Sequence, residues 1–159
     1  MTEKEMRPIV VRWLFDRGYY PLHEILVGHY VDLIGVQFQP RVGRKIPPLQ
    51  DVIAVELKIK DYRGVLSQTR NCQHFVSQAY AALPSDQCGR MTPKVLDRFG
   101  QHGVGVLAVD SAVSLVMPAR FCPKEWKHIN KRYWATALRQ RHRTCPLLNK
   151  LNEPTGKDT

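Results

Sequence analysis

The stretch that decides the fold is Asp51–Lys60, which reads DVIAVELKIK. Its apolar run Val52–Val55 is typical of a central strand that is covered on both faces. Because side chains alternate along a strand, Glu56 and Lys58 point to the same side at its end. Charged groups are costly to bury unless they are paired or bind a metal, so this pair indicates a functional site. An ordinary surface ion pair on an edge strand is the alternative interpretation.

A second carboxylate lies inside another apolar stretch. Asp32 is in the middle of Tyr30–Phe38, which is rich in strand-forming residues and is predicted to be a strand. If this strand neighbours Asp51–Lys60 in a meander, Asp32 lies beside Glu56; a position in a turn is the alternative. Two carboxylates could bind Mg²⁺ through oxygen, and a bound cation acidifies a water molecule. Lys58 could then neutralise charge that develops on a phosphate.

The rest of the chain predicts an α/β fold with a mixed central sheet of about five strands flanked by helices. The other expected strands are Leu22–Val27, Gly103–Val109 and Ala112–Met117. The expected helices are residues 2–17, Leu66–Leu83, Pro93–Phe99 and a basic C-terminal helix, Lys124–Arg143. We therefore expect a core over residues 1–120, a basic helical extension packed on it over residues 121–151, and a flexible tail over residues 152–159.

The predicted helix Leu66–Leu83 directly follows the Glu56 strand and carries Gln68 near its start. At helical spacing, Gln68 falls on the same stripe as Cys72, Val76 and Ala79, which predicts that it is buried. A buried amide needs a hydrogen-bond partner, and the neighbouring site could supply one. A glutamine satisfied within the core or at the helix start is the alternative.

The order of these elements resembles the PD-(D/E)xK nuclease superfamily, which includes restriction enzymes, archaeal Holliday-junction resolvases and RecB-type exonucleases. The resemblance covers roughly residues 3–117. The matching motifs are Val31-Asp32-Leu33-Ile34, Ala54-Val55-Glu56-Leu57-Lys58 and Gln68-Thr69-Arg70-Asn71-Cys72. The chain departs from the family pattern at Val31, where the family has a proline, and at Cys72, where RecB-like members often have a tyrosine.

The resemblance implies a restriction-endonuclease-like fold and a set of catalytic residues. Asp32, Glu56 and the backbone carbonyl of Leu57 would bind Mg²⁺, with Mn²⁺ able to substitute, and Lys58 would assist the attacking water. Gln68 would contribute from its helix. A glutamate on the first helix often takes part in this family, and Glu5 is preferred here over Glu3. A capping box between Thr2 and Glu5 is the competing role for that side chain.

The charge of the chain favours a polyanionic partner. Its formal net charge is +10, and the segment from Arg120 to Lys150 holds nine Lys or Arg and one Glu. Solvated charges are the alternative interpretation at each position. The predicted nucleic-acid contacts are Arg41, Arg44, Lys45, Lys60, Arg63, Arg70, Lys127, Lys131 and Arg132.

The sequence therefore predicts a magnesium-dependent deoxyribonuclease that acts in repair, recombination or defence. Its expected partner is duplex or branched DNA, with RNA left open. Cutting two strands commonly takes two active centres, which favours a homodimer. The alternatives are a catalytically inactive DNA-binding module of nuclease fold, and a basic scaffold that binds RNA or protein. No apolar run reaches the roughly 20 residues that span a bilayer, no signal-peptide pattern opens the chain, and we expect a cytoplasmic protein with free thiols.

Overall fold

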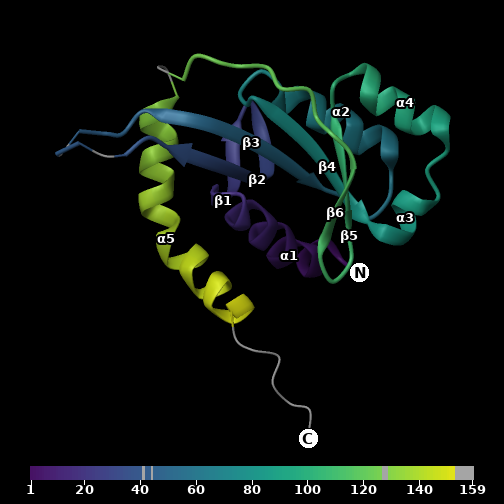
Figure 1. The fold of residues 1–159 in the computed structure, drawn as a ribbon, viewed down its shortest axis with the longest axis horizontal. Helices are drawn as coiled ribbons and strands as arrows, with labels where there is room; N and C mark the ends of the chain where they lie inside the picture. Colours follow the sequence, from purple (N-terminus) through teal and green to yellow (C-terminus); the bar gives the residue numbers. More distant parts are fainter. Residues whose placement is uncertain (41, 44, 127–128, 153–159) are drawn as a thin grey trace, which may run out of the picture.

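A computed structural model describes the chain except for residues 41, 44, 127, 128 and 153–159, and it describes side chains in the last helix only up to residue 141. The described residues form one mixed sheet with helices on both faces (Figure 1). The strands are β1 (Tyr20–Val27), β2 (His29–Phe38), β3 (Leu49–Leu57), β4 (Gln78–Pro84), β5 (Gly105–Val109) and β6 (Val113–Met117). The helices are α1 (Glu3–Asp16), α2 (Tyr62–Cys72), α3 (Ser85–Gly89), α4 (Pro93–Gln101) and α5 (Asn130–Asn152).

Among the described residues, the sheet has six strands in chain order, from β1 to β6. The first three strands form an antiparallel meander, as predicted. β3, β4 and β5 then run parallel, and β6 returns antiparallel to β5. The two parallel steps are crossovers through α2 and through α3 and α4. The α/β class with a mixed sheet is confirmed.

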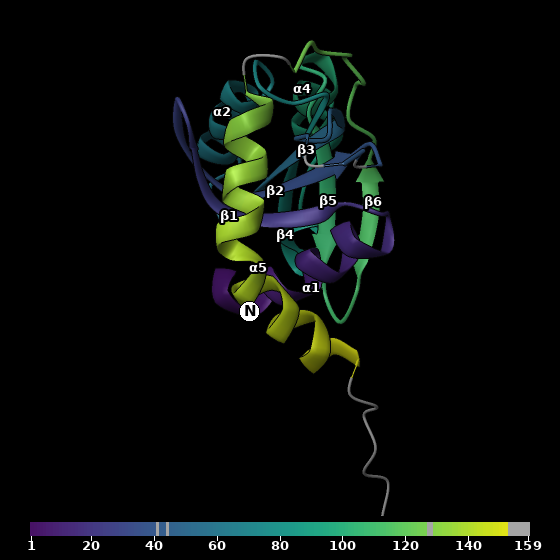
Figure 2. The same ribbon diagram turned by 90° about the vertical axis from the view of Figure 1, so that its left-hand side faces the viewer.

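β3 is the central strand that its sequence predicts. Every residue from Val52 to Leu57 is buried. Ile53, Val55 and Leu57 pack with the apolar side of α1 on one face. Val52 and Ala54 pack on the other face with α5 and the end of α2, which Figure 2 shows beside the sheet. The strand is thus covered on both faces, which accounts for its uninterrupted apolar run.

The predicted helix Leu66–Leu83 is wrong in its second half. α2 ends at Cys72, a turn follows, and Gln78–Pro84 is strand β4. Ser77 fixes this change of direction, because its N–H and its hydroxyl both donate to the Val52 carbonyl on β3, at 2.9 Å each. β4 is buried on both faces and therefore lacks the alternation of a half-exposed strand. Its alanines also suit a helix, so its apolar positions matched a helical period by coincidence.

α1 begins as its sequence suggests. The Thr2 hydroxyl accepts the Glu5 N–H at 3.2 Å, and the Glu5 carboxylate accepts the Thr2 N–H at 2.6 Å, which completes a capping box. Pro8 lies inside the helix. The predicted short helix near Pro93 and the two strands at Gly105 and Val113 are confirmed within a few residues.

The last helix begins later than predicted, at Asn130 rather than Lys124. It packs against β1, and its own residue Tyr133 is fully buried. The predicted tail begins at Asn152, the last residue of α5, and residues 153–159 lie outside the described residues. No described helix combines the length and apolar character needed to cross a membrane.

Gln140 joins α5 to β1 through two hydrogen bonds. Its side-chain oxygen accepts the His23 N–H at 2.7 Å, and its side-chain nitrogen donates to the His23 carbonyl at 2.7 Å. Both bonds are buried, so their loss would remove two hydrogen bonds from buried backbone groups.

We therefore expect Gln140→Leu to lower the free energy of unfolding by about 2–4 kcal/mol, because removing one partner of a buried hydrogen bond costs roughly 1–3 kcal/mol. Urea denaturation measures this change. The exposed neighbour Leu138 provides the matched control, and Leu138→Gln should change the free energy of unfolding by about 0.5 kcal/mol or less. Equal stability of Gln140→Leu and the wild type would contradict the role assigned to this amide.

Candidate functional site

The register of β2 and β3 brings the two predicted carboxylates together. Leu33 pairs with Val55 and Ile34 with Ala54. Continuing this antiparallel register by one residue places Asp32 opposite Glu56, with both side chains on the same face. Asp32 Oδ2 accepts the Leu57 N–H at 2.9 Å, which holds this carboxylate at the end of β3.

The two carboxylates differ in their surroundings. The Glu56 residue is only 3% exposed, whereas the Asp32 side chain is 29% exposed. Burial raises the pKa of the Glu56 carboxyl, hydrogen bonds from His29 and Cys72 act in the opposite direction, and the Asp32 charge raises the pKa further. A buried acid beside a second acid is an arrangement that a bound cation would stabilise.

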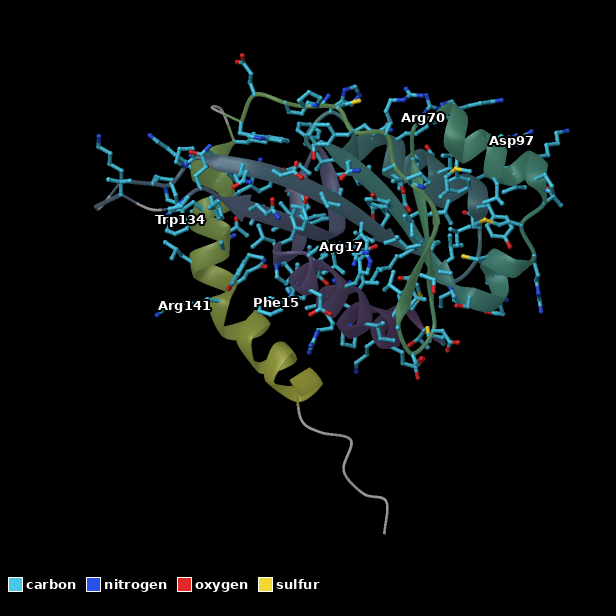
Figure 3. All side chains as sticks on the ribbon, in the orientation of Figure 1. Phe15, Arg17, Arg70, Asp97, Trp134 and Arg141 are labelled. Carbon is cyan, nitrogen blue, oxygen red and sulfur yellow. The ribbon has the colours of Figure 1, made fainter. Side chains whose placement is uncertain are left out.

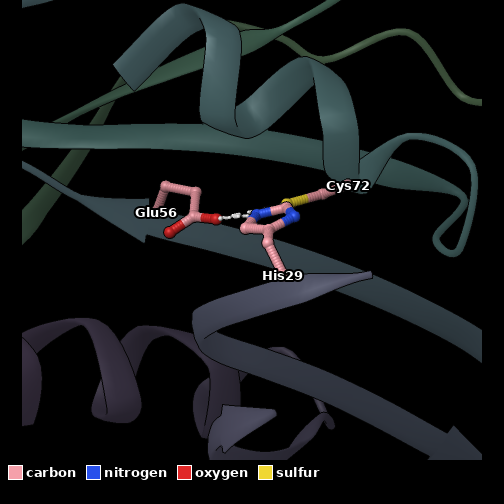
Figure 4. Close-up of side chains that lie close together, drawn as sticks. All are labelled: His29, Glu56 and Cys72. Carbon is pink, nitrogen blue, oxygen red and sulfur yellow. Dashed lines mark hydrogen bonds and ion pairs between the residues drawn. The ribbon is translucent and has the colours of Figure 1, made fainter. Parts of the chain in front are cut away.

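His29 and Cys72 complete a compact group around Glu56, shown in Figure 4. His29 Nε2 lies 2.9 Å from Glu56 Oε1, and the Cys72 thiol donates to the same oxygen at 3.3 Å. Cys72 Sγ lies 3.6 Å from His29 Nε2. Sequence reasoning missed both partners. The only signal was Cys72 itself, which stands where the RecB-like members of the superfamily that the sequence resembles often have a tyrosine.

Arg7 on α1 binds Asp32 from the other side. One guanidinium nitrogen donates to the Asp32 carbonyl at 2.9 Å, and the other lies 3.4 Å from Asp32 Oδ1. The second nitrogen is also 3.9 Å from Glu24 Oε1. Arg7 was not predicted, because nothing in the local pattern of α1 separates it from a solvated arginine. Its positive charge balances the negative charge of Asp32.

Lys58 follows directly on the end of β3 and is partly buried. Its backbone N–H donates to the Ala82 carbonyl at 3.0 Å, which fixes the main chain at this point. Lys58 follows Glu56 by two residues, and its ammonium group has no partner among the described residues.

Glu5 has the capping role given as its alternative, whereas Gln68 is placed differently from expectation. The Glu5 carboxylate binds the Thr2 backbone in the capping box. Gln68 is exposed, so its predicted place on a buried stripe is wrong; the buried positions of α2 are Val65, Thr69 and Cys72. The error follows from the misplaced end of this helix. The Gln68 carbonyl accepts a hydrogen bond from the Cys72 thiol at 3.4 Å.

The predicted nucleic-acid contacts are surface residues wherever the structure describes them. The exposed ones are Lys45, Lys60, Arg63, Arg70, Lys131 and Arg132. Arg41, Arg44 and Lys127 lie outside the described residues. Arg70, labelled in Figure 3, also lines a surface cleft of about 470 Å³, which we call the basic cleft. Its lining is Ser67, Arg70, Asn71, Gln73, His74, His102, Arg120, Cys122 and Lys124.

Comparison with known proteins shows a likeness in fold. No model of a known protein family matches the chain, and no curated protein matches it. A solved structure described as the SPO1766 protein of unknown function from Silicibacter pomeroyi is similar, with a TM-score of 0.56 and 18% identity. The match covers 96% of this chain and 92% of that one. The mixed α/β architecture is thus shared over nearly the whole length of both chains.

The position of Arg7 leads to a test of the carboxylate pair. We expect Arg7→Gln to lower the free energy of unfolding by about 1–2 kcal/mol without divalent metal, because a charged hydrogen bond is lost and Asp32 remains beside Glu56. Mg²⁺ should restore part of this loss, since a ligand that binds the folded state stabilises it.

Thermal unfolding with and without Mg²⁺ measures both effects. The control is Arg12→Gln, which removes a largely exposed ion pair with Asp16 and should cost about 0.5 kcal/mol or less. If Mg²⁺ shifted the unfolding temperature of the wild type and Arg7→Gln equally, Arg7 would not compete with a cation at Asp32.

Proposed function

We propose that this protein is a magnesium-dependent nuclease of restriction-endonuclease-like fold that hydrolyses DNA phosphodiester bonds. One observation carries the proposal: neighbouring antiparallel strands bring Asp32 and Glu56 to one face, and Lys58 follows two residues later. These residues come from separate stretches of the chain. Their convergence at the end of a buried strand is hard to explain by packing alone.

The donor set fits a hard divalent cation. The carboxylates of Asp32 and Glu56 supply oxygen ligands, and the Leu57 carbonyl lies at the same strand end. When bound, Mg²⁺ or Mn²⁺ would polarise the phosphate and acidify a coordinated water. The hydrogen bond from the Leu57 N–H orients the Asp32 carboxylate in advance, so less reorganisation is needed when a cation binds.

Lys58 supplies a positive charge where the reaction develops negative charge. Its main chain is fixed by Ala82, and its side chain is partly buried. An ammonium group at this position could donate to the attacking water or to a phosphate oxygen in the transition state. Lys58 is therefore the residue whose removal should affect turnover most directly.

The surface charge supports a nucleic-acid substrate. The net charge of +10 comes with exposed cations on several elements, including Lys60 and Arg63 just beyond β3. The basic cleft has three Lys or Arg residues and two His in its lining and no acidic residue. Such a surface binds the phosphate backbone without regard to sequence. DNA is the proposed substrate, and RNA is the alternative substrate. Two copies of the chain would be needed to cut both DNA strands together.

A non-catalytic DNA-binding module is the second candidate. It is favoured by the partners that both carboxylates already have: Arg7 binds Asp32, while His29 and Cys72 bind Glu56. In that case the carboxylates would serve stability alone. The same assay separates the two candidates, because a module of this kind binds DNA and leaves it intact.

We expect the wild type to cleave DNA in Mg²⁺ or Mn²⁺, and Lys58→Ala to lower kcat by about 100-fold or more, as for loss of one transition-state donor. Asp32→Asn should lose cleavage as well, whereas the exposed Glu5 should tolerate Glu5→Gln. Linear, circular, branched and single-stranded DNA are incubated in parallel and the products separated by size.

Equal products from the wild type and Lys58→Ala would place the activity elsewhere or in a contaminant. Retained DNA binding without any cleavage by the wild type would support the binding module. Absence of binding to any nucleic acid at low salt would support the protein-binding scaffold instead.

DNA binding should weaken steeply with salt. Four phosphate contacts predict about a 100-fold loss of affinity between 50 and 200 mM salt, because counterions are released on binding. Arg70→Ala should reduce the slope of log affinity against log salt by about 1. Lys94→Ala, which removes an exposed lysine outside the basic cleft, is the matched control. Fluorescence anisotropy measures the slopes, and an equal slope for wild type and Arg70→Ala would remove Arg70 from the interface.

A further inference from the structure

We propose that His29, Glu56 and Cys72 form a binding site for a zinc-like transition metal, beside the magnesium position at Asp32. The inference goes beyond the nuclease function and does not require it. It begins from three different ligand types, one nitrogen, one oxygen and one sulfur, that converge from β2, β3 and the end of α2 (Figure 4).

The spacing of the three atoms fits tetrahedral coordination. Zinc binds nitrogen and oxygen at about 2.0–2.2 Å and sulfur at about 2.3 Å, so tetrahedral ligand atoms are separated by roughly 3.3–3.7 Å. Here the three separations are 2.9, 3.3 and 3.6 Å. The shortest separation, between His29 Nε2 and Glu56 Oε1, is a few tenths of an ångström below this range. Side-chain shifts of roughly that size would make room for the ion.

The ligand types select the metal. Thiolate and imidazole ligands suit zinc and other late transition metals, whereas magnesium prefers oxygen ligands alone. The three side chains leave a fourth tetrahedral position, and the His29 side chain is 29% exposed, so a water molecule can reach it. A site with three protein ligands and one open position is the arrangement of catalytic rather than purely structural zinc.

Charge neutrality favours occupation. On binding, the Cys72 thiol would release its proton to solvent and donate an electron pair to the metal as thiolate. Thiolate and the Glu56 carboxylate together carry two negative charges, which a divalent ion neutralises in a buried setting. Without the metal, a weak thiol donor and His29 are the hydrogen-bond partners of Glu56 Oε1 among the described residues.

Glu56 is shared between this site and the carboxylate pair. Its Oε1 faces His29 and Cys72, while its second oxygen points away from them (Figure 4). One carboxylate could therefore contact two ions at once. Asp32 belongs only to the magnesium side, and Cys72 only to the zinc side, so variants can separate the two.

The test uses the full chain, stripped of metal with EDTA and titrated with Co²⁺ alone and then with Zn²⁺ alone. We expect one Co²⁺ per chain, with a sulfur-to-cobalt charge-transfer band in the absorption spectrum. Cys72→Ser should abolish the band and weaken Zn²⁺ binding at least about 10-fold. His29→Ala should weaken Zn²⁺ binding similarly. Because His29 is partly exposed, this variant should still fold, and it therefore provides the test if Cys72→Ser does not fold.

Two controls make the outcome decisive. Cys122→Ser, at an exposed cysteine, and Asp32→Asn, on the magnesium side, should both keep the band. That combination would support the zinc site whether or not the nuclease proposal holds. A wild type without the band, or a band that survives Cys72→Ser, would show that the three side chains form a hydrogen-bonded group and no metal site.

Discussion

The pairing of β2 with β3 is the constraint on which the rest of the site depends. A shift of one residue in this register would turn Asp32 to the opposite face from Glu56. The hydrogen bond from the Leu57 N–H to Asp32 ties the register at the end of the strand where the charges lie. The apolar residues of β3 then hold the strand between α1 on one face and α2 and α5 on the other. The placement of the two carboxylates therefore depends on the burial of Val52–Leu57.

The parts of the fold that could be predicted are those whose signals are local. Apolar and β-branched runs predict β2 and β3, and a capping sequence followed by an apolar stripe predicts α1. β4 could not be separated from a helix, because a strand buried on both faces has no alternation and its alanines suit either structure. Tertiary contacts decide between them: β4 pairs with β3 and β5, and Ser77 binds Val52.

In the candidate site, too, the residues with a local sequence signal could be predicted and the others could not. Asp32, Glu56 and Lys58 could be proposed from sequence because each is a charge set in or after an apolar strand. Arg7, His29 and Cys72 have no such signal, since an arginine on a helix, a histidine at the start of a strand and a buried cysteine are common in any protein. Their contacts with Asp32 and Glu56 form only when α1, β2, β3 and the end of α2 come together in the fold. Sequence thus indicated the acids, while their partners required the fold.

The contact between Gln140 and His23 has a consequence for how the protein is made. β1 is an edge strand, and the Gln140 amide binds the N–H and carbonyl of His23 that would otherwise face outward. The two residues are separated by 117 positions in the chain. During synthesis β1 is made early, and its outer edge stays uncovered until α5 has also been made. An uncovered strand edge can recruit other chains, so premature termination before α5 would yield a product prone to aggregation as well as one that lacks a helix.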